Sequence, residues 1–386
     1  MVNAALPSTA EIVAAGEAAL SAASGHACRL TSPVQLGGSD RSAVLRVAME
    51  SASPGAPATV VLKAHRREAA GTFLDEAAGL AFSDSGPKLL AVDSAESVMV
   101  LEDLGAPSSL ADLLLGDDPE RAATAATAWA GAFGRLCAES AGRQAEFAAL
   151  RQQFGGEPTN PQDETWLPRA IRQLPATFGA LGVELPPGLD TELISLLVLT
   201  EPGEFAVFSP GDVCPDNNLF TPDGLRFLDF ESAGFHSVFL DAAYTRLPFA
   251  TCWCVFTPPP GLTGLMEAAF RAEIVRAFPA LADDATWDQG VRAACAVWVL
   301  SMSLWLLPGA LDDATEMVPA GGRAPGRRPY LAHRWRWLAD ELDRAGELPA
   351  IHALLRGALA SAAERWTQSD LVLLGYPAFR ASAGAK

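Results

Sequence analysis

Short apolar runs rich in β-branched residues mark the first hundred residues of the chain. They lie at 43–47, 59–63 and 97–101, and each predicts a β-strand because Val, Ile and Thr suit a pleated, half-buried surface. The segment between the first two runs, 51–57, contains Ser, Pro and Gly, which are typical of turns. Residues 1–24 differ, since their alanine-rich pattern with two glutamates is helical.

The period changes between residues 68 and 82. Apolar side chains recur there at i, i+4, i+7 and i+8, which is the spacing of one face of a helix: Phe73, Ala77, Leu80 and Ala81. The strand predicted at 97–101 follows this helix, and the polar residues after it predict a connection between two parts of the fold.

Helical spacing dominates the rest of the chain. The stretches 120–141 and 262 onward are rich in Ala, Leu, Trp and Arg, and the one compact β-like island lies at 205–230. We therefore expect an α+β fold with two lobes. Residues 1–105 are predicted to form a small β-rich N-terminal lobe with a hinge near 101–105, and residues 106–386 a larger, mainly helical C-terminal lobe.

The composition narrows the class of partner. The 386 residues carry a formal charge of −18 with 49% hydrophobic and 19% charged residues, which is a globular composition. Negative charge repels phosphate backbones and anionic lipids, so nucleic acid and membrane surfaces are not expected partners. A neutral or cationic small molecule is compatible with this charge.

The cysteines and the apolar runs indicate the compartment. Six cysteines without a C-x-x-C pair are interpreted as reduced thiols. The first 24 residues lack the basic region of a signal peptide. The longest apolar run, 293–307, is followed by Pro308 and is shorter than the ~20 residues of a bilayer span. We expect a buried helix there and a cytoplasmic protein.

Candidate chemistry is concentrated in the β-like island. Asp212 precedes Asn217 by five positions, and a Thr-Pro-Asp-Gly turn at 221–224 reverses the chain and returns Asp229 toward Asn217. Side-chain oxygens brought together in this way suit a hard cation. Asp212 lies outside the hairpin and is free to face an approaching hydroxyl group.

These residues resemble a known family. Gly211-Asp212-x-x-x-x-Asn217 followed by Phe227-Leu-Asp-Phe-Glu231 is similar to the catalytic and metal-binding loops of the aminoglycoside phosphotransferase and choline kinase family, which has a protein-kinase-like fold. The resemblance implies that Asp212 accepts or orients the proton of the acceptor hydroxyl. It implies that Asn217 and Asp229 hold Mg²⁺, and that Asp241, in a D-L-A-like element, is structural.

The same resemblance implies a nucleotide site in the first lobe. Gly37, Gly38 and Ser39 match a glycine-rich loop whose backbone approaches the phosphates. The residues after the strand at 97–101, including Glu102 and Leu104, match the hinge where backbone groups meet adenine.

Lys63 matches the strand lysine that contacts the α- and β-phosphates. Glu76 lies thirteen residues later on the predicted helix and is expected to pair with Lys63, while Glu68 is the rival partner nearer the start of that helix. The pairing would keep the ammonium group directed toward the phosphates.

Two departures from the family pattern bear on activity and substrate. Pro210 stands where the family has a histidine that supports the metal-binding loop, and the last residues, 380–386, lack the carboxylates with which some aminoglycoside kinases bind ammonium groups. The reacting groups Asp212, Asn217 and Asp229 are all present, which favours an active enzyme.

The expected function is phosphoryl transfer from ATP, or GTP, with Mg²⁺ to a hydroxyl group of a small molecule such as an aminoglycoside, a sugar or an amino alcohol. Two alternatives remain open. One is phosphorylation of Ser or Thr in a peptide that docks beside Asp212, with the basic segment Arg323–Arg336 along the groove. The other is a nucleotide-binding pseudokinase.

Overall fold

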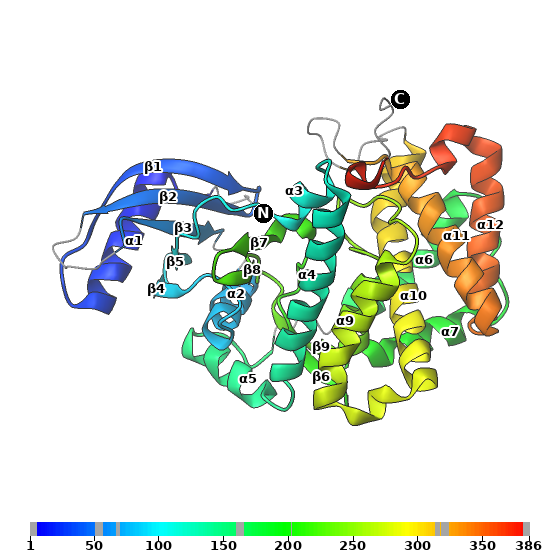
Figure 1. The fold of residues 1–386 in the computed structure, drawn as a ribbon, viewed down its shortest axis with the longest axis horizontal. Helices are drawn as coiled ribbons and strands as arrows, with labels where there is room; N and C mark the ends of the chain where they lie inside the picture. The colour runs from blue at the N-terminus through cyan, green and yellow to red at the C-terminus, as the bar shows by residue number, and fades with distance from the viewer. Residues whose placement is uncertain are drawn as a thin grey trace.

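The computed structural model describes residues 6–50, 57–66, 70–159, 166–201, 203–312, 317 and 324–380. A five-stranded sheet with helix α1 lies at one end of the molecule, and a large group of helices occupies the rest (Figure 1). The expectation of a two-lobed α+β fold is confirmed.

The sheet is antiparallel throughout, with the strand order β1-β2-β3-β5-β4. Its strands are β1 (Arg29–Gly38), β2 (Ser42–Glu50), β3 (Thr59–His65), β4 (Leu89–Asp93) and β5 (Val98–Glu102). β2 and β3 contain the runs predicted at 43–47 and 59–63, and β5 lies one residue later than the run predicted at 97–101. The bounds of β1 and β4, the two edge strands, were not predicted from the sequence.

Helix α1 (Thr9–Ser24) covers one face of the sheet. Val60, Leu62 and Ala64 of β3 share a buried cluster with this helix. Because side chains alternate along a strand, Lys63 and His65 point to the opposite face, toward α2 (Ala70–Phe82). The alternation of β3 thus separates its core side from its polar side.

Helix α2 packs against the helical part of the protein as well as the sheet. Phe73, Ala77 and Leu80 are buried as expected, but Ala81 is exposed and Phe82 takes its place in the core. A Cβ atom on Gly79 would lie 2.9 Å from Phe230 Cδ1, so this glycine allows α2 to approach the chain just after Asp229 closely.

The remaining elements follow in chain order, and they are mostly helical. The helices are α3 (Leu110–Leu114), α4 (Pro119–Glu139), α5 (Gln144–Gln153), α6 (Trp166–Ala180), α7 (Leu189–Ser195), α8 (Val238–Arg246), α9 (Leu262–Ala277), α10 (Asp284–Leu311), α11 (Arg327–Ala345) and α12 (Pro349–Arg365). Short 3₁₀ turns are η3 (Leu196–Thr200), η4 (Pro215–Asn217), η5 (Pro279–Ala282), η6 (Gln368–Leu371) and η7 (Pro377–Phe379). The β-like island contains β6 (Ala206–Ser209), β7 (Asn218–Thr221), β8 (Gly224–Phe227) and β9 (Gly234–Ser237).

The predicted apolar run belongs to α10, which is longer than expected. This helix has 28 residues because it begins at Asp284, nine residues before the predicted run, and continues through Pro308 to Leu311. Among the described helices, α10 alone has the length and apolar composition of a membrane span, and 61% of its most apolar window is buried inside the protein. Val291, Leu300 and Leu307 lie in the main hydrophobic cluster, as expected of a core helix.

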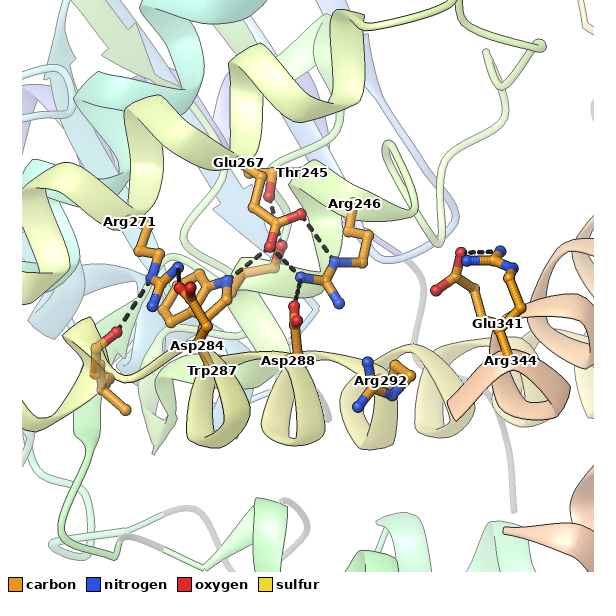
Figure 2. Close-up of polar contacts among 12 residues, drawn as sticks. Thr245, Arg246, Glu267, Arg271, Asp284, Trp287, Asp288, Arg292, Glu341 and Arg344 are labelled. Atoms are coloured by element: carbon orange, nitrogen blue, oxygen red, sulfur yellow. Dashed lines mark hydrogen bonds and ion pairs between the residues drawn. The ribbon is translucent and has the colours of Figure 1, made fainter. Parts of the chain in front are cut away.

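A partly buried ion-pair network joins three helices of the helical part (Figure 2). Arg246, in the last turn of α8, donates to Glu267 of α9 and to Asp288 of α10, at 2.5 Å from the latter's Oδ1 atom. The indole N–H of Trp287 also donates to Glu267, at 2.6 Å. The network fixes the position of α8, the helix that carries Asp241 next to the candidate site.

Candidate active site

The loop that carries Asp212 is tied to α8 by a buried carboxylate. Asp241 accepts a hydrogen bond from Ser209 Oγ at 2.8 Å and lies 2.9 Å from His236 Nε2. Ser209 ends β6 immediately before Pro210, and its hydroxyl also accepts the Gly211 N–H at 3.2 Å. Asp241 therefore occupies the structural position that the resemblance implies for it.

Gly211 is required by its backbone conformation and its surroundings. Its φ is 90°, which residues with a Cβ atom rarely adopt, and a Cβ atom would lie 2.4 Å from Ser232 O. The residue before Asp212 must therefore be glycine for the loop to approach the chain that follows Asp229.

Asp212 is largely buried, and its carboxylate is held by the loop. Its Oδ1 atom accepts the Cys214 N–H at 3.0 Å, and its side chain also interacts with Asn217. Burial, followed by the negative charge of Asp229, raises the pKa of Asp212 to about 6. A carboxylate with this pKa can take up a proton near neutral pH.

The predicted hairpin brings Asn217 and Asp229 to the same cleft. Strands β7 and β8 pair from Asn218 with Phe227 to Thr221 with Gly224, and the Leu228 N–H donates to Asn217 O at 2.8 Å. Both residues line one cavity, and Asp229 Oδ1 accepts the Glu231 N–H at 3.1 Å. Their side-chain oxygens form the kind of donor set that Mg²⁺ prefers.

Lys63 and Glu76 form the ion pair that the sequence predicts. Lys63 Nζ lies 2.7 Å from Glu76 Oε1, 3.3 Å from Asp229 Oδ1 and 3.2 Å from Glu231 Oε1. Burial by itself would lower the pKa of Lys63, but the three carboxylates together hold it above its ordinary value. The rival partner, Glu68, lies outside the described residues.

Both oxygens of Glu76 are engaged. Its Oε2 atom lies 2.7 Å from His65 Nε2, and both side chains are fully buried. His65, Glu76 and Glu231 are close enough together to suggest a metal site by distance alone. Because Lys63 and His65 already contact the oxygens of Glu76, this cluster is better described as an ion pair with an adjoining hydrogen bond.

The glycine-rich segment lies at the end of β1, which includes Gly37 and Gly38, and continues from Ser39 into the turn before β2. The Ser39 N–H donates to Ser42 O at 2.8 Å, and a Cβ atom on Gly38 would lie 2.5 Å from that same oxygen. Arg41, in this turn, lies 3.4 Å from Glu231 Oε2 across the cleft. The turn is thus linked to the residues that follow Asp229.

A cleft of about 580 Å³ lies between the sheet and the helical part. The predicted residues on its walls are Gly37, Gly38, Ser39, Lys63, Glu102, Leu104, Asn217 and Asp229. Glu76 and Asp212 do not line it: Glu76 lies behind Lys63, and Asp212 contacts the cleft residue Asn217. The structure therefore brings the predicted residues together.

Asp103, which lies between Glu102 and Leu104 in the predicted hinge, stabilises the fold through its side chain. Asp103 pairs with Arg46 Nε at 2.7 Å and accepts the Thr59 hydroxyl at 2.7 Å. Burial would raise the pKa of Asp103, but the hydrogen bonds from Arg46 and Thr59 outweigh it and lower this pKa. Asp103 thus fastens the predicted hinge to strands β2 and β3 of the sheet.

A second cavity, of about 480 Å³, adjoins the Asp212 loop. Gly211 and Ser232 line it, together with Tyr244, Thr251 and Trp298. Tyr244 donates to or accepts from Thr251 Oγ1 at 2.6 Å. Asp212 thus lies next to a residue of each cavity, Gly211 on one side and Asn217 on the other.

One sequence interpretation is wrong. Cys214 and Cys252 form a disulfide, so these two cysteines are not reduced thiols in the structure. The sequence did not indicate this bond because the two residues are 38 positions apart and carry no spacing motif. Cys28, Cys137, Cys254 and Cys295 are outside any disulfide.

Sequence reasoning also missed several charged residues of the cleft. Arg41, Asp216 and Glu231 line it beside the predicted residues. Glu231 closes the Phe227–Glu231 motif, which was an available indication, whereas Arg41 and Asp216 are single charged residues in turns. Such residues are usually solvated, so the sequence offered no reason to select them.

The basic segment is mostly packed into the fold where it is described. Arg334 is buried and donates to Pro248 O at 2.6 Å, and Arg328 lies over Trp366 and pairs with Asp370. Arg323 lies outside the described residues. The described part of this segment therefore does not form a continuous basic groove.

Comparison with known proteins identifies the fold. No protein-family model matches the sequence, and no curated protein matches it. Among solved structures, choline kinase from Cryptosporidium parvum Iowa II aligns with a TM-score of 0.51 and 14% identity, over 84% of this chain and 93% of the other.

Two further structures align less closely. A choline/ethanolamine kinase family protein from Mesorhizobium loti has a TM-score of 0.44 and 17% identity, over 86% of this chain and 93% of its own. An amicoumacin kinase in complex with AMP-PNP and Ca²⁺ has a TM-score of 0.42 and 13% identity, over 81% and 88%. From the first alignment and the two-lobed architecture, the chain has the protein-kinase-like fold of choline kinase.

Proposed function

We propose that this protein is a phosphotransferase that uses ATP and Mg²⁺ to phosphorylate a hydroxyl group of a small molecule. The observation that carries the proposal is the shared cleft. It combines a glycine turn, the ammonium group of Lys63 and the oxygens of Asn217 and Asp229, with Asp212 in contact with Asn217. These are the parts that phosphoryl transfer requires for positioning and charge stabilisation.

The cleft residues divide into nucleotide-binding and metal-binding groups in this proposal. Backbone groups of the hinge at 102–104 face adenine, Gly37 to Ser39 approach the phosphates, and Lys63 contacts them. Asn217 and Asp229 offer hard oxygen ligands, which fit Mg²⁺. When bound, Mg²⁺ offsets negative charge on the phosphate oxygens.

Asp212 is proposed to accept the proton of the acceptor hydroxyl. A general base works best when its pKa lies near the working pH, and the pKa of about 6 meets this condition. Asp212 is only partly exposed, so a bound hydroxyl group can replace solvent as its partner.

The second cavity is proposed as the acceptor site, because Gly211 on its wall directly precedes Asp212. Its volume of about 480 Å³ lies within the range of roughly 300–1,000 Å³ that small-molecule sites occupy. The packing of Arg328 and Arg334 into the fold gives no support to a long peptide groove. A small molecule is therefore the favoured acceptor. The location of the protein in the cytoplasm remains a separate prediction.

A transfer assay tests this function. The protein would be incubated with Mg²⁺ and γ-labelled ATP, and with aminoglycosides, sugars, amino alcohols and hydroxylated peptides in turn. We expect transfer to at least one small molecule, and a loss of ~10²–10⁴-fold in Asp212→Asn. Binding of Mg-ATP to this variant should stay near the wild-type affinity, because Asp212 faces the acceptor.

Asp223→Asn provides the matched control, since Asp223 is exposed in the turn of the neighbouring hairpin. It should keep full activity. Binding of Mg-ATP without any turnover across the panel would instead favour a pseudokinase. An Asp212→Asn variant with more than about a tenth of wild-type turnover would remove Asp212 from the role of base.

A further inference from the structure

The Asp212 loop is joined to one distant segment at two points. Cys214 forms the disulfide with Cys252, and the indole N–H of Trp253 donates to Asp216 Oδ2 at 2.9 Å. The two loop residues flank Pro215, and the two partners are consecutive. Residues 252 and 253 therefore hold the loop at the N-cap of its 3₁₀ turn and at the middle residue of that turn.

The partner segment, residues 248–253, is itself fixed to the helical part of the protein. Arg334 of α11 donates to Pro248 O at 2.6 Å, and Tyr330 of the same helix donates to Ala250 O. Thr251 is hydrogen-bonded to Tyr244 of α8. We call residues 248–253 the anchor segment, since it has contacts to two helices and to the loop.

The anchored loop residues are the ones that hold the candidate reactive groups. The Cys214 N–H donates to Asp212 Oδ1 at 3.0 Å, and Cys214 O accepts the Asn217 N–H at 2.9 Å. Cys214 thus has a backbone contact to the proposed base and another to the proposed metal ligand. A displacement of Cys214 would move both.

Asp216 also depends on a contact with the anchor segment. Its Oδ2 atom has the Trp253 N–H as partner, while its Oδ1 atom is buried without a hydrogen bond among the described residues. A buried carboxylate oxygen without a partner is unfavourable, so the hydrogen bond from Trp253 is needed to keep Asp216 in place. Asp216 directly precedes Asn217.

We propose that Cys252 and Trp253 are positioning residues of the active site, and that turnover depends on the Cys214–Cys252 bond. This inference rests on the proposed phosphotransferase function. The disulfide and the indole N–H hold the loop from outside, in addition to Asn218, whose side-chain amide binds Val213 O from within the loop at 3.0 Å. Without the outer contacts, Asp212 and Asn217 lose their fixed separation.

We call the Cys214–Cys252 bond and the hydrogen bond from Trp253 to Asp216 together the clamp. Reduction by a dithiol would break its disulfide. A thiolate of the dithiol attacks one sulfur of the Cys214–Cys252 bond, which forms a mixed disulfide and releases the other cysteine as a thiolate. The second thiol of the dithiol then attacks the dithiol's own sulfur in this mixed disulfide and releases the remaining cysteine. The dithiol becomes a cyclic disulfide, and its two protons and two electrons leave Cys214 and Cys252 as thiols. Because the Cys252 side chain is buried, this reaction requires local opening, and so the variants below test the proposal without it.

The experiment compares Cys214→Ser/Cys252→Ser, Trp253→Phe and the wild type. Trp253→Phe removes the N–H donor and keeps an aromatic ring. Turnover of Mg-ATP, measured as ADP release, should fall roughly tenfold or more in each variant, as expected when a base loses its position. The dissociation constant of Mg-AMP-PNP should change less than turnover, because Asn217 is the one proposed metal or nucleotide contact on the loop, whereas Asp229, Lys63, the glycine turn and the hinge are untouched.

A direct readout of the loop separates this proposal from the proposed function. Amide hydrogen exchange at Val213 to Asn218 should become faster in both variants, whether or not the wild type turns over ATP. Faster exchange in a protein without turnover would support the clamp and contradict the phosphotransferase function. Wild-type turnover in both variants, or unchanged exchange, would overturn the clamp.

Matched controls come from the same residue types elsewhere. Cys254→Ser removes a buried sulfur outside the disulfide, and Trp305→Phe changes an exposed tryptophan of α10. Both should keep wild-type turnover and exchange. The melting temperature of each variant is measured alongside, because equal losses of activity in the controls would indicate general destabilisation and would refute the positioning role.

Discussion

Replacement of Glu76 by Gln tests the ion-pair network behind the cleft. Glu76 is fully buried, and its two oxygens contact Lys63 and His65 at 2.7 Å each. The amide that replaces the carboxylate has one acceptor and one donor group, so it cannot accept from both partners. His65 Nδ1 is already buried without a partner among the described residues, so a change of tautomer leaves another buried group unsatisfied.

The magnitude follows from the loss of a buried charge partner. We expect a cost of about 3 kcal/mol in the free energy of unfolding, at the lower end of the range for broken buried pairs. With about 2.1 cal/mol/K per residue, the 386 residues give an unfolding entropy near 0.8 kcal/mol/K, so the melting temperature should fall by roughly 4 °C.

Nucleotide binding should weaken as well. Lys63 keeps Asp229 and Glu231 as partners, and these draw its ammonium group away from the phosphates. Loss of a charge-assisted hydrogen bond of about 1.5–3 kcal/mol corresponds to a rise of roughly 10- to 150-fold in the dissociation constant. Calorimetric titration with Mg-AMP-PNP measures this change, and thermal unfolding measures the stability.

Asp75→Asn is the matched control. Asp75 is a buried acid on the same helix, but it pairs with Arg151 of α5 at 2.5 Å instead of Lys63. It should destabilise the protein to a similar extent without an effect on nucleotide affinity. If Glu76→Gln bound Mg-AMP-PNP as tightly as Asp75→Asn, the role of Glu76 in directing Lys63 would be refuted.

Three further predictions concern other parts of the molecule. Asp229→Asn should weaken Mg-ATP binding about tenfold or more but leave metal-free ATP binding nearly unchanged, and equal Mg²⁺ dependence in titrations would contradict the metal role. Burial lowers the pKa of His333 to about 3, so stability present above pH 6.5 is lost as the pH falls: urea unfolding should show a loss of about 2 kcal/mol between pH 7 and pH 5 that is absent in His333→Gln. Arg246→Met should cost about 3 kcal/mol in urea unfolding, whereas Arg344→Met, which breaks an exposed pair, should cost less than about 1 kcal/mol (Figure 2); equal costs would contradict the importance of burial.

The sequence by itself determined the elements whose formation depends on near neighbours. The β7–β8 hairpin follows from its Thr-Pro-Asp-Gly turn, and the order of Lys63, the hinge and the Asp212 loop is a property of the chain. The core faces of β3 and α2 follow from periods of two and 3.6 residues, because these repeats fix which side chains share a face.

The sequence alone determined the edge strands and the helix ends less well. β1 was not predicted because most of its residues are exposed, so it has no buried face to impose an alternation. It is a strand because β2 supplies its hydrogen-bond partners. In the same way, α10 continues through Pro308 because packing around the helix outweighs the local cost of proline.

Only the tertiary structure decided which distant groups meet. The pairing of Arg41 with Glu231, of Cys214 with Cys252 and of Asp216 with Trp253 joins residues from different elements, and none of these pairs has a characteristic spacing. The same is true of the burial that raises the pKa of Asp212 to about 6. Such contacts depend on how whole helices and strands pack, and local sequence preferences act over only a few residues, so the chain specifies the parts of the site locally and their geometry through the complete fold.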